Sequence, residues 1–150
     1  MQAAPIAAAT SSRLDRSRWS PTDLVAGAGI LVLVISLFLP WFGVSIGPIG
    51  ITIDGLTAHG YLYLVLILAL VELVYLVAIA GKPEPGGRTP VSHESLLSVI
   101  NIINVILVVV GFLDKEGSAG WRFGAIVALI AAVVAAAPTL VISLSGRARR

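Results

Sequence analysis

A single glutamate near the middle of a long apolar run is the residue whose position most favours chemistry. Glu72 is the only acidic or basic side chain in residues 61–80, YLYLVLILALVELVYLVAIA. At about 1.5 Å per residue this run is about 30 Å long, which matches the hydrocarbon core of a bilayer. It lacks the polar face, repeating every 3.6 residues, of a soluble surface helix. Because a carboxyl is costly to ionise at that depth, we expect Glu72 to face other helices and to be protonated or paired.

Polar partners for this carboxyl occur in the next apolar run, SLLSVINIINVIL, which carries Ser98, Asn101 and Asn104. Measured from residue 80 for Glu72 and from residue 94 for the asparagines, which are the helix ends expected on the cytoplasmic side, Glu72 lies ~12 Å deep, Asn101 ~10 Å and Asn104 ~15 Å. A hydrogen bond between the helices is therefore geometrically allowed. One interpretation of this polar cluster is a proton or cation relay. The other is a structural clamp that fixes the register of two helices, which is the commoner use of such bonds.

Few other residues have side chains that could form a catalytic or ligand-binding site. Asp54 and His59 fall in one segment between apolar runs, but two ligands without a third make a weak cation site, so we expect a solvated pair. His93 is expected at the start of a helix. There are no cysteines, and no catalytic triad, phosphate-binding glycine loop or H-E-x-x-H motif is present. The sequence therefore predicts no enzyme, no cofactor and no metal site.

The elements that must position these residues are four apolar helices. We predict membrane spans at about 21–39, 61–80, 94–113 and 121–144, within a domain covering residues 19–146. We predict that residues 1–18 form a disordered cytoplasmic tail and that residues 147–150 form a basic cytoplasmic tail. Pro40 ends the first span, and Trp41 and Phe42 are expected in the aromatic belt of the far interface.

The segment between the first two spans, residues 43–60, contains no lysine or arginine. Apolar and small or polar residues alternate on both sides of a Gly-Pro-Ile-Gly turn, which predicts a short β-hairpin; an irregular loop at the interface is the alternative. The predicted fold class is thus an all-α membrane protein. It is a four-helix antiparallel transmembrane bundle with a short extracytoplasmic loop or hairpin.

Composition and charge placement support this fold. Hydrophobic residues make up 57% of the 150 residues and charged residues only 12%, about half the charged share of a soluble domain. The cations lie at the ends of the apolar runs, which favours membrane topology over nucleic-acid binding. Only Lys115 and Arg122 fall on one side, whereas the other eight lysines and arginines fall on the opposite side. By the positive-inside rule, both termini are predicted to be cytoplasmic in the plasma membrane.

Small residues predict where two helices pack. Gly27 and Gly29 in the first span lie at a depth comparable to that of Ala132 and Ala136 in the fourth, which runs in the opposite direction. Small side chains let backbones approach closely in lipid, so we expect contact between the first and fourth helices. The same surface is alternatively available to a homo-oligomer.

Three stretches carry a resemblance: FLPWFGV, DGLTAHGYLYL and GWRFGAIVALIAA. Across residues 19–144 the chain resembles small, uncharacterised four-helix integral membrane proteins of actinobacteria, in which an LPWF motif closes the first helix. The resemblance implies a bacterial plasma-membrane setting and no particular mechanism.

These observations lead to two main functional expectations. The first is a non-enzymatic accessory or scaffolding component of a membrane assembly, whose partners are the lipid bilayer and other membrane proteins or further copies of the chain. The second is a small oligomeric transporter or channel that uses Glu72 as a proton or cation site. A lipid-handling or envelope-stress sensor acting through residues 43–60 is a third possibility.

Overall fold

The computed structural model describes residues 21–46, 48–80, 93–115, 117 and 119–147. The tail predicted at residues 1–18 lies outside the described residues, as does all of the tail predicted at 147–150 except Arg147. The elements in chain order are α1 (Pro21–Leu37), β1 (Pro40–Ile46), β2 (Ile49–Asp54), α2 (Gly55–Ala58), α3 (Leu62–Ala80), α4 (His93–Leu113), β3 (Gly120–Trp121) and α5 (Phe123–Arg147).

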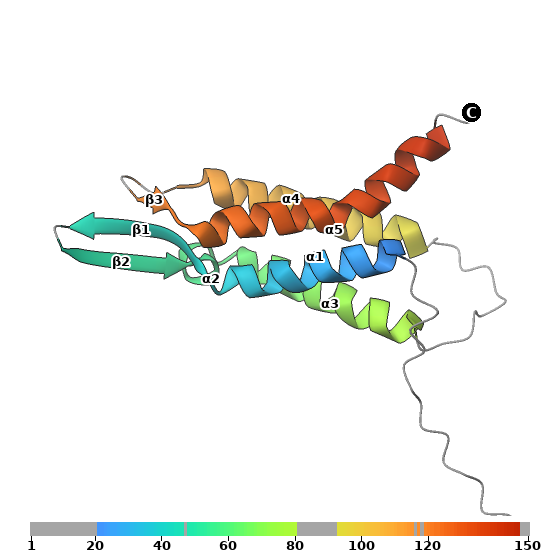
Figure 1. Ribbon diagram of the computed structural model, residues 1–150, viewed down its shortest axis with the longest axis horizontal. Helices are drawn as coiled ribbons and strands as arrows, with labels where there is room; N and C mark the ends of the chain where they lie inside the picture. Colours follow the sequence, from blue (N-terminus) through green and yellow to red (C-terminus); the bar gives the residue numbers. More distant parts are fainter. Residues whose placement is uncertain (1–20, 47, 81–92, 116, 118, 148–150) are drawn as a thin grey trace, which may run out of the picture.

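Four long helices run side by side, and the strands extend beyond one end of the group (Figure 1). Helix α1 packs against α5 and α3, and α4 packs against the same two helices. The predicted, predominantly helical architecture is therefore confirmed, with a small β-sheet added at one end. Helix α1 stops two residues before the predicted end of the first span, because the chain has already turned into β1 at Pro40.

The sheet has three antiparallel strands in the order β2–β1–β3. Strands β1 and β2 form the hairpin that the sequence predicted, in a register that pairs Phe42 with Ile53 and Val44 with Ile51. The third strand was not predicted. It consists of Gly120 and Trp121, in the connection between α4 and α5, and it pairs with Gly43 and Phe42 of β1. The sheet thus joins the two connections at this end of the bundle.

Trp41 and Phe42 do not face outward, as side chains of an aromatic belt would: both are buried, at 0% and 5% exposure. The register of β1 against β2 shifts between Pro40 and Phe42, which makes Trp41 the extra residue of a β-bulge. Its indole Nε1 donates a 2.8 Å hydrogen bond to the carbonyl of Ser36. Trp41 therefore fills the junction between the sheet and the helices.

Glycine makes room for this indole. A Cβ atom added at Gly55 would lie 2.7 Å from Cε2 of Trp41, and one added at Gly111 of α4 would lie 3.2 Å from Cζ3. Around the indole, the core is completed by buried residues of the four long helices: Leu33, Leu37, Leu62, Val65, Val108, Ala125, Ala128 and Ala132.

The closest approach of α1 to α5 occurs at Gly29. A Cβ atom there would lie 2.7 Å from the backbone nitrogen of Ala135, so the two helices touch backbone to backbone. Ala132 and Ala136 are both buried at 1% exposure, while Gly27 is only half-buried. The contact is therefore between α1 and α5, and its tightest point lies two residues beyond Gly27.

The outward faces of the long helices are apolar. Exposed side chains include Ile35, Leu64, Ile67, Ile106 and Ile130, each 48–59% exposed. Among the described residues, one stretch is long and apolar enough to cross a bilayer: Leu96–Leu113, with a mean hydropathy of 2.7. The apolar parts of the other helices, Pro21–Leu37, Leu62–Ala78 and Phe123–Pro138, are shorter than this.

Candidate functional site

The polar cluster in the bundle is built around a hydrogen bond between α3 and α4. Asn101 Nδ2 donates to Glu72 Oε1 at 2.6 Å, and the same nitrogen lies 3.0 Å from the carbonyl oxygen of Leu97 in its own helix. Glu72 is 1% exposed and Asn101 2% exposed. The bond is thus shielded from solvent, and it links two neighbouring helices through their side chains.

The other members of the predicted cluster lie on α4. Asn104 is 1% exposed, and Ser98, one turn before Asn101, is half-buried. Three buried atoms of this cluster have no hydrogen-bond partner among the described residues: Oε2 of Glu72 and both amide heteroatoms of Asn104. Such groups are rare in folded interiors because each carries a desolvation cost of about 1–3 kcal/mol. The cluster therefore keeps unused hydrogen-bonding capacity.

Asp54 and His59, the two residues considered as a cation site, have different partners in the structure. Both carboxylate oxygens of Asp54 are used within its own segment, where Thr57 donates from its backbone N–H at 2.9 Å and from its hydroxyl at 2.8 Å. Asp54 is the N-cap of α2. His59 is only 7% exposed, so the expectation of a solvated pair with Asp54 is wrong. The described residues contain no group of three or more His, Cys, Asp or Glu side chains suited to a metal.

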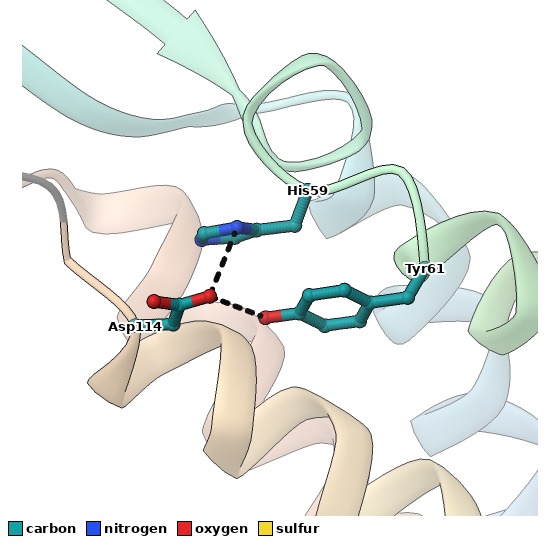
Figure 2. A network of polar contacts seen from close by, with 3 residues as sticks. All are labelled: His59, Tyr61 and Asp114. Carbon is teal, nitrogen blue, oxygen red and sulfur yellow. Dashed lines mark hydrogen bonds and ion pairs between the residues drawn. The ribbon is translucent and has the colours of Figure 1, made fainter.

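His59 instead lies against a different carboxylate, that of Asp114 just after α4. His59 Nδ1 is 3.7 Å from Asp114 Oδ2, and the hydroxyl of Tyr61 donates to the same oxygen at 3.5 Å. Figure 2 shows the two side chains approaching this oxygen from the segment between α2 and α3. The imidazole stacks on the Tyr61 ring at 5.2 Å and meets the edge of Phe42 at 5.5 Å. These contacts fix the carboxylate at the end of α4.

A cavity of about 220 Å³ opens beside these residues. Its walls include the apolar side chains of Phe42, Val44 and Ile53 from the hairpin, while His59 and Asp114 are its polar members. The residues that line it offer no hydroxyl or thiol nucleophile. The cavity is therefore suited to binding an apolar group with one polar end.

The sequence contained a signal for this second site that the pattern analysis did not use. Tyr61 opens the second apolar run and Asp114 closes the third, so an antiparallel bundle brings both residues to the same end as His59. The burial of His59 had no such signal in the sequence, because it depends on packing against Phe42 of the hairpin.

Comparison of the chain with protein-family models, with curated proteins and with solved structures gives no match. The two sites are therefore interpreted from their own geometry and chemistry.

Proposed function

We propose that the protein is an integral membrane protein whose four long helices, α1, α3, α4 and α5, all span the bilayer. The observation that carries this proposal is the inverted distribution of side chains. Large aliphatic side chains cover the outward faces of the helices, while Glu72, Asn101 and Asn104 are buried among them. Only 22% of the Leu96–Leu113 stretch is buried, whereas the core helix of a soluble protein is mostly buried. Lipid is the solvent that suits such an exterior.

The proposed orientation places both termini in the cytoplasm of a bacterial cell and the three-stranded sheet outside. In this orientation the side with eight lysines and arginines is cytoplasmic, and the side with Lys115 and Arg122 is extracytoplasmic. Lys115 lies over the Trp121 ring at 4.9 Å, and Arg122 packs against Gly43, so both outer cations contact the sheet.

Within the membrane, the proposed role is that of a non-enzymatic accessory or scaffolding component of a membrane assembly. The Glu72–Asn101 bond supports it, because a short, solvent-shielded bond between neighbouring helices gives a rigid bundle. The experiment is native purification in a mild detergent, followed by mass measurement of the intact complex. The expected result is a stoichiometric complex with a membrane partner. A chain that stays without a partner at native expression levels contradicts the proposal.

The second candidate is a small oligomeric transporter or channel, and one observation favours it. Oε2 of Glu72 is buried without a hydrogen-bond partner among the described residues, as a proton-carrying site between two helices would be. Proteoliposomes that contain a pH-sensitive dye separate the two functions. A relay gives proton flux that is lost in Glu72→Gln, whereas a scaffold gives no flux above that of protein-free vesicles in either form.

A further inference from the structure

The β1–β2 hairpin has two faces of opposite character. Successive residues of a strand point to opposite sides, and paired residues share a side. Phe42 and Val44 therefore share one face with their partners Ile53 and Ile51, and Ile49 continues this face along β2. The three isoleucines are 43–65% exposed. The opposite face carries small and polar residues, namely Gly43, Ser45, Gly50 and Thr52.

The apolar face leads directly into the cavity. Phe42, Val44 and Ile53 line it, and Ile51 and Ile49 lie further along the same face, away from the helices. The hairpin extends past the end of the bundle (Figure 1). The cavity and the apolar face of the hairpin together form one surface, which leads from Ile49 to the carboxylate of Asp114 after α4.

The carboxylate of Asp114, at one end of this surface, is free to accept a cationic partner. The side-chain polar contacts of Asp114 with His59 and Tyr61 both use Oδ2 (Figure 2), and no hydrogen bond or ion pair to Oδ1 is found among the described residues. Its side chain is 59% exposed, so it is accessible. No described lysine or arginine pairs with it, since its neighbour Lys115 lies over Trp121. The buried Nε2 of His59 also has no hydrogen-bond partner among the described residues.

We propose that this surface binds an aminolipid extracted from the outer leaflet, with its ammonium group at Asp114 and its alkyl chain along the apolar face of the hairpin, outside the bilayer. The outer-leaflet source rests on the proposed membrane orientation. Charge complementarity selects the ammonium group, because the polar end of the cavity offers acceptors and a negative charge. At about 30 Å³ per water-sized group, a 220 Å³ cavity holds the head and the first few carbons of the chain. This site does not depend on the scaffolding role.

The test uses the full chain, purified in maltoside micelles, and a photoreactive probe. The probe is dodecylamine with a diazirine in its alkyl chain, and cross-linked residues are mapped by mass spectrometry. The expected products lie on the hairpin at Ile49 to Ile53. Unlabelled dodecylamine should compete, whereas dodecanoate, which has the opposite charge, and propylamine, which lacks the chain, should not. If the protein recognised the ammonium group alone, propylamine would also compete. The comparison with propylamine therefore distinguishes binding of a lipid from binding of a free amine.

Three substitutions complete the test. Asp114→Asn should lower the cross-linking yield about tenfold, because the charged hydrogen bond is lost. His59→Phe keeps the ring packing but removes both nitrogens, and should lower the yield less. Thr52→Ser, on the opposite face of the hairpin, should leave it unchanged. Near-ultraviolet circular dichroism verifies folding; if His59→Phe unfolds, the exposed Asp114 still decides the outcome.

Two outcomes overturn the proposal. One is equal labelling of the wild-type protein and Asp114→Asn, together with competition by dodecanoate, which indicates partitioning of the probe without recognition of its head. The other is a dimer in which the hairpin is protected from the probe, which indicates that a second copy of the chain covers the apolar face.

Discussion

Asn101 of α4 donates a 2.6 Å hydrogen bond to Glu72 of α3, in a part of the bundle where both side chains are at most 2% exposed. The geometry sets a requirement for an acceptor at residue 72, and a neutral amide oxygen meets it as well as a carboxyl does. Substitutions of Glu72 can therefore separate the structural role of this hydrogen bond from a functional role of the carboxyl group.

Glu72→Gln should change the free energy of unfolding in detergent by less than about 0.5 kcal/mol, since glutamine still accepts from Asn101. Glu72→Leu should cost about 1–3 kcal/mol, because Asn101 then loses its interhelical acceptor. Chemical unfolding followed by circular dichroism measures both values. Equal destabilisation by Gln and Leu contradicts the clamp.

Gly29→Ala should destabilise the bundle by about 1–3 kcal/mol, because the added methyl group would lie 2.7 Å from the backbone of Ala135. Ala28→Leu is the matched control, since Ala28 is exposed and should tolerate the larger side chain. Thermal unfolding in detergent compares the two. A smaller loss for Gly29→Ala than for Ala28→Leu is the result that rejects this contact.

Single cysteines report the proposed topology cleanly, because the chain has no cysteine of its own. Ser45→Cys, at an exposed position of the hairpin, should react in intact cells with a membrane-impermeant thiol reagent. Ser12→Cys should react only after the cells are opened. Labelling of Ser12→Cys from outside reverses the orientation.

Trp41→Phe should cost about 1–3 kcal/mol, as it removes the hydrogen bond to Ser36 and leaves part of a fully buried site empty. Trp121→Phe is the comparison, because Trp121 is 49% exposed. Thermal unfolding measures the two losses. A greater loss for Trp121→Phe is inconsistent with Trp41 as the residue that joins sheet and helices.

Acid should loosen the cap of α2. Partial burial acts to raise the pKa of Asp54, but hydrogen bonds from Thr57 outweigh it and hold the pKa below its usual value of 3.8. A lowered pKa in the folded state means that the stabilisation is complete above pH 3.8 and is lost as pH falls through the lower, folded value. The protection of the Thr57 amide against exchange, relative to its intrinsic rate at the same pH, should therefore fall below pH 3.8. Asp54→Asn keeps a capping oxygen and should show no such pH dependence.

Much of the helical architecture was predictable, because the position of each helix is determined by a local feature: an apolar run bounded by proline, glycine or charged residues. The predicted starts of the runs at 21–39, 61–80 and 94–113 lie within one residue of helices α1, α3 and α4. Depth along two antiparallel helices likewise suggested Asn101 or Asn104 as a partner for Glu72, and the structure shows the bond to Asn101.

The end of the molecule that carries the β-sheet was less predictable, because its contacts are non-local. A strand of two residues such as Gly120–Trp121 has no periodicity, and only its pairing with β1 defines it. The burial of Trp41 depends on a bulge and on glycines in two other elements. The contact of His59 with Asp114 joins segments 55 residues apart, which no local pattern encodes.

The pairing of Phe42 with Trp121 sets an order of assembly. Strand β1 is synthesised long before β3, and the two meet only when α3 and α4 have placed both connections at the same end. The hairpin can form early, but the edge of β1 at Phe42 and Gly43 stays unpaired until α3 and α4 have folded. Closure of the three-stranded sheet is thus a late step in folding, because β3 reaches β1 only through the helices between them.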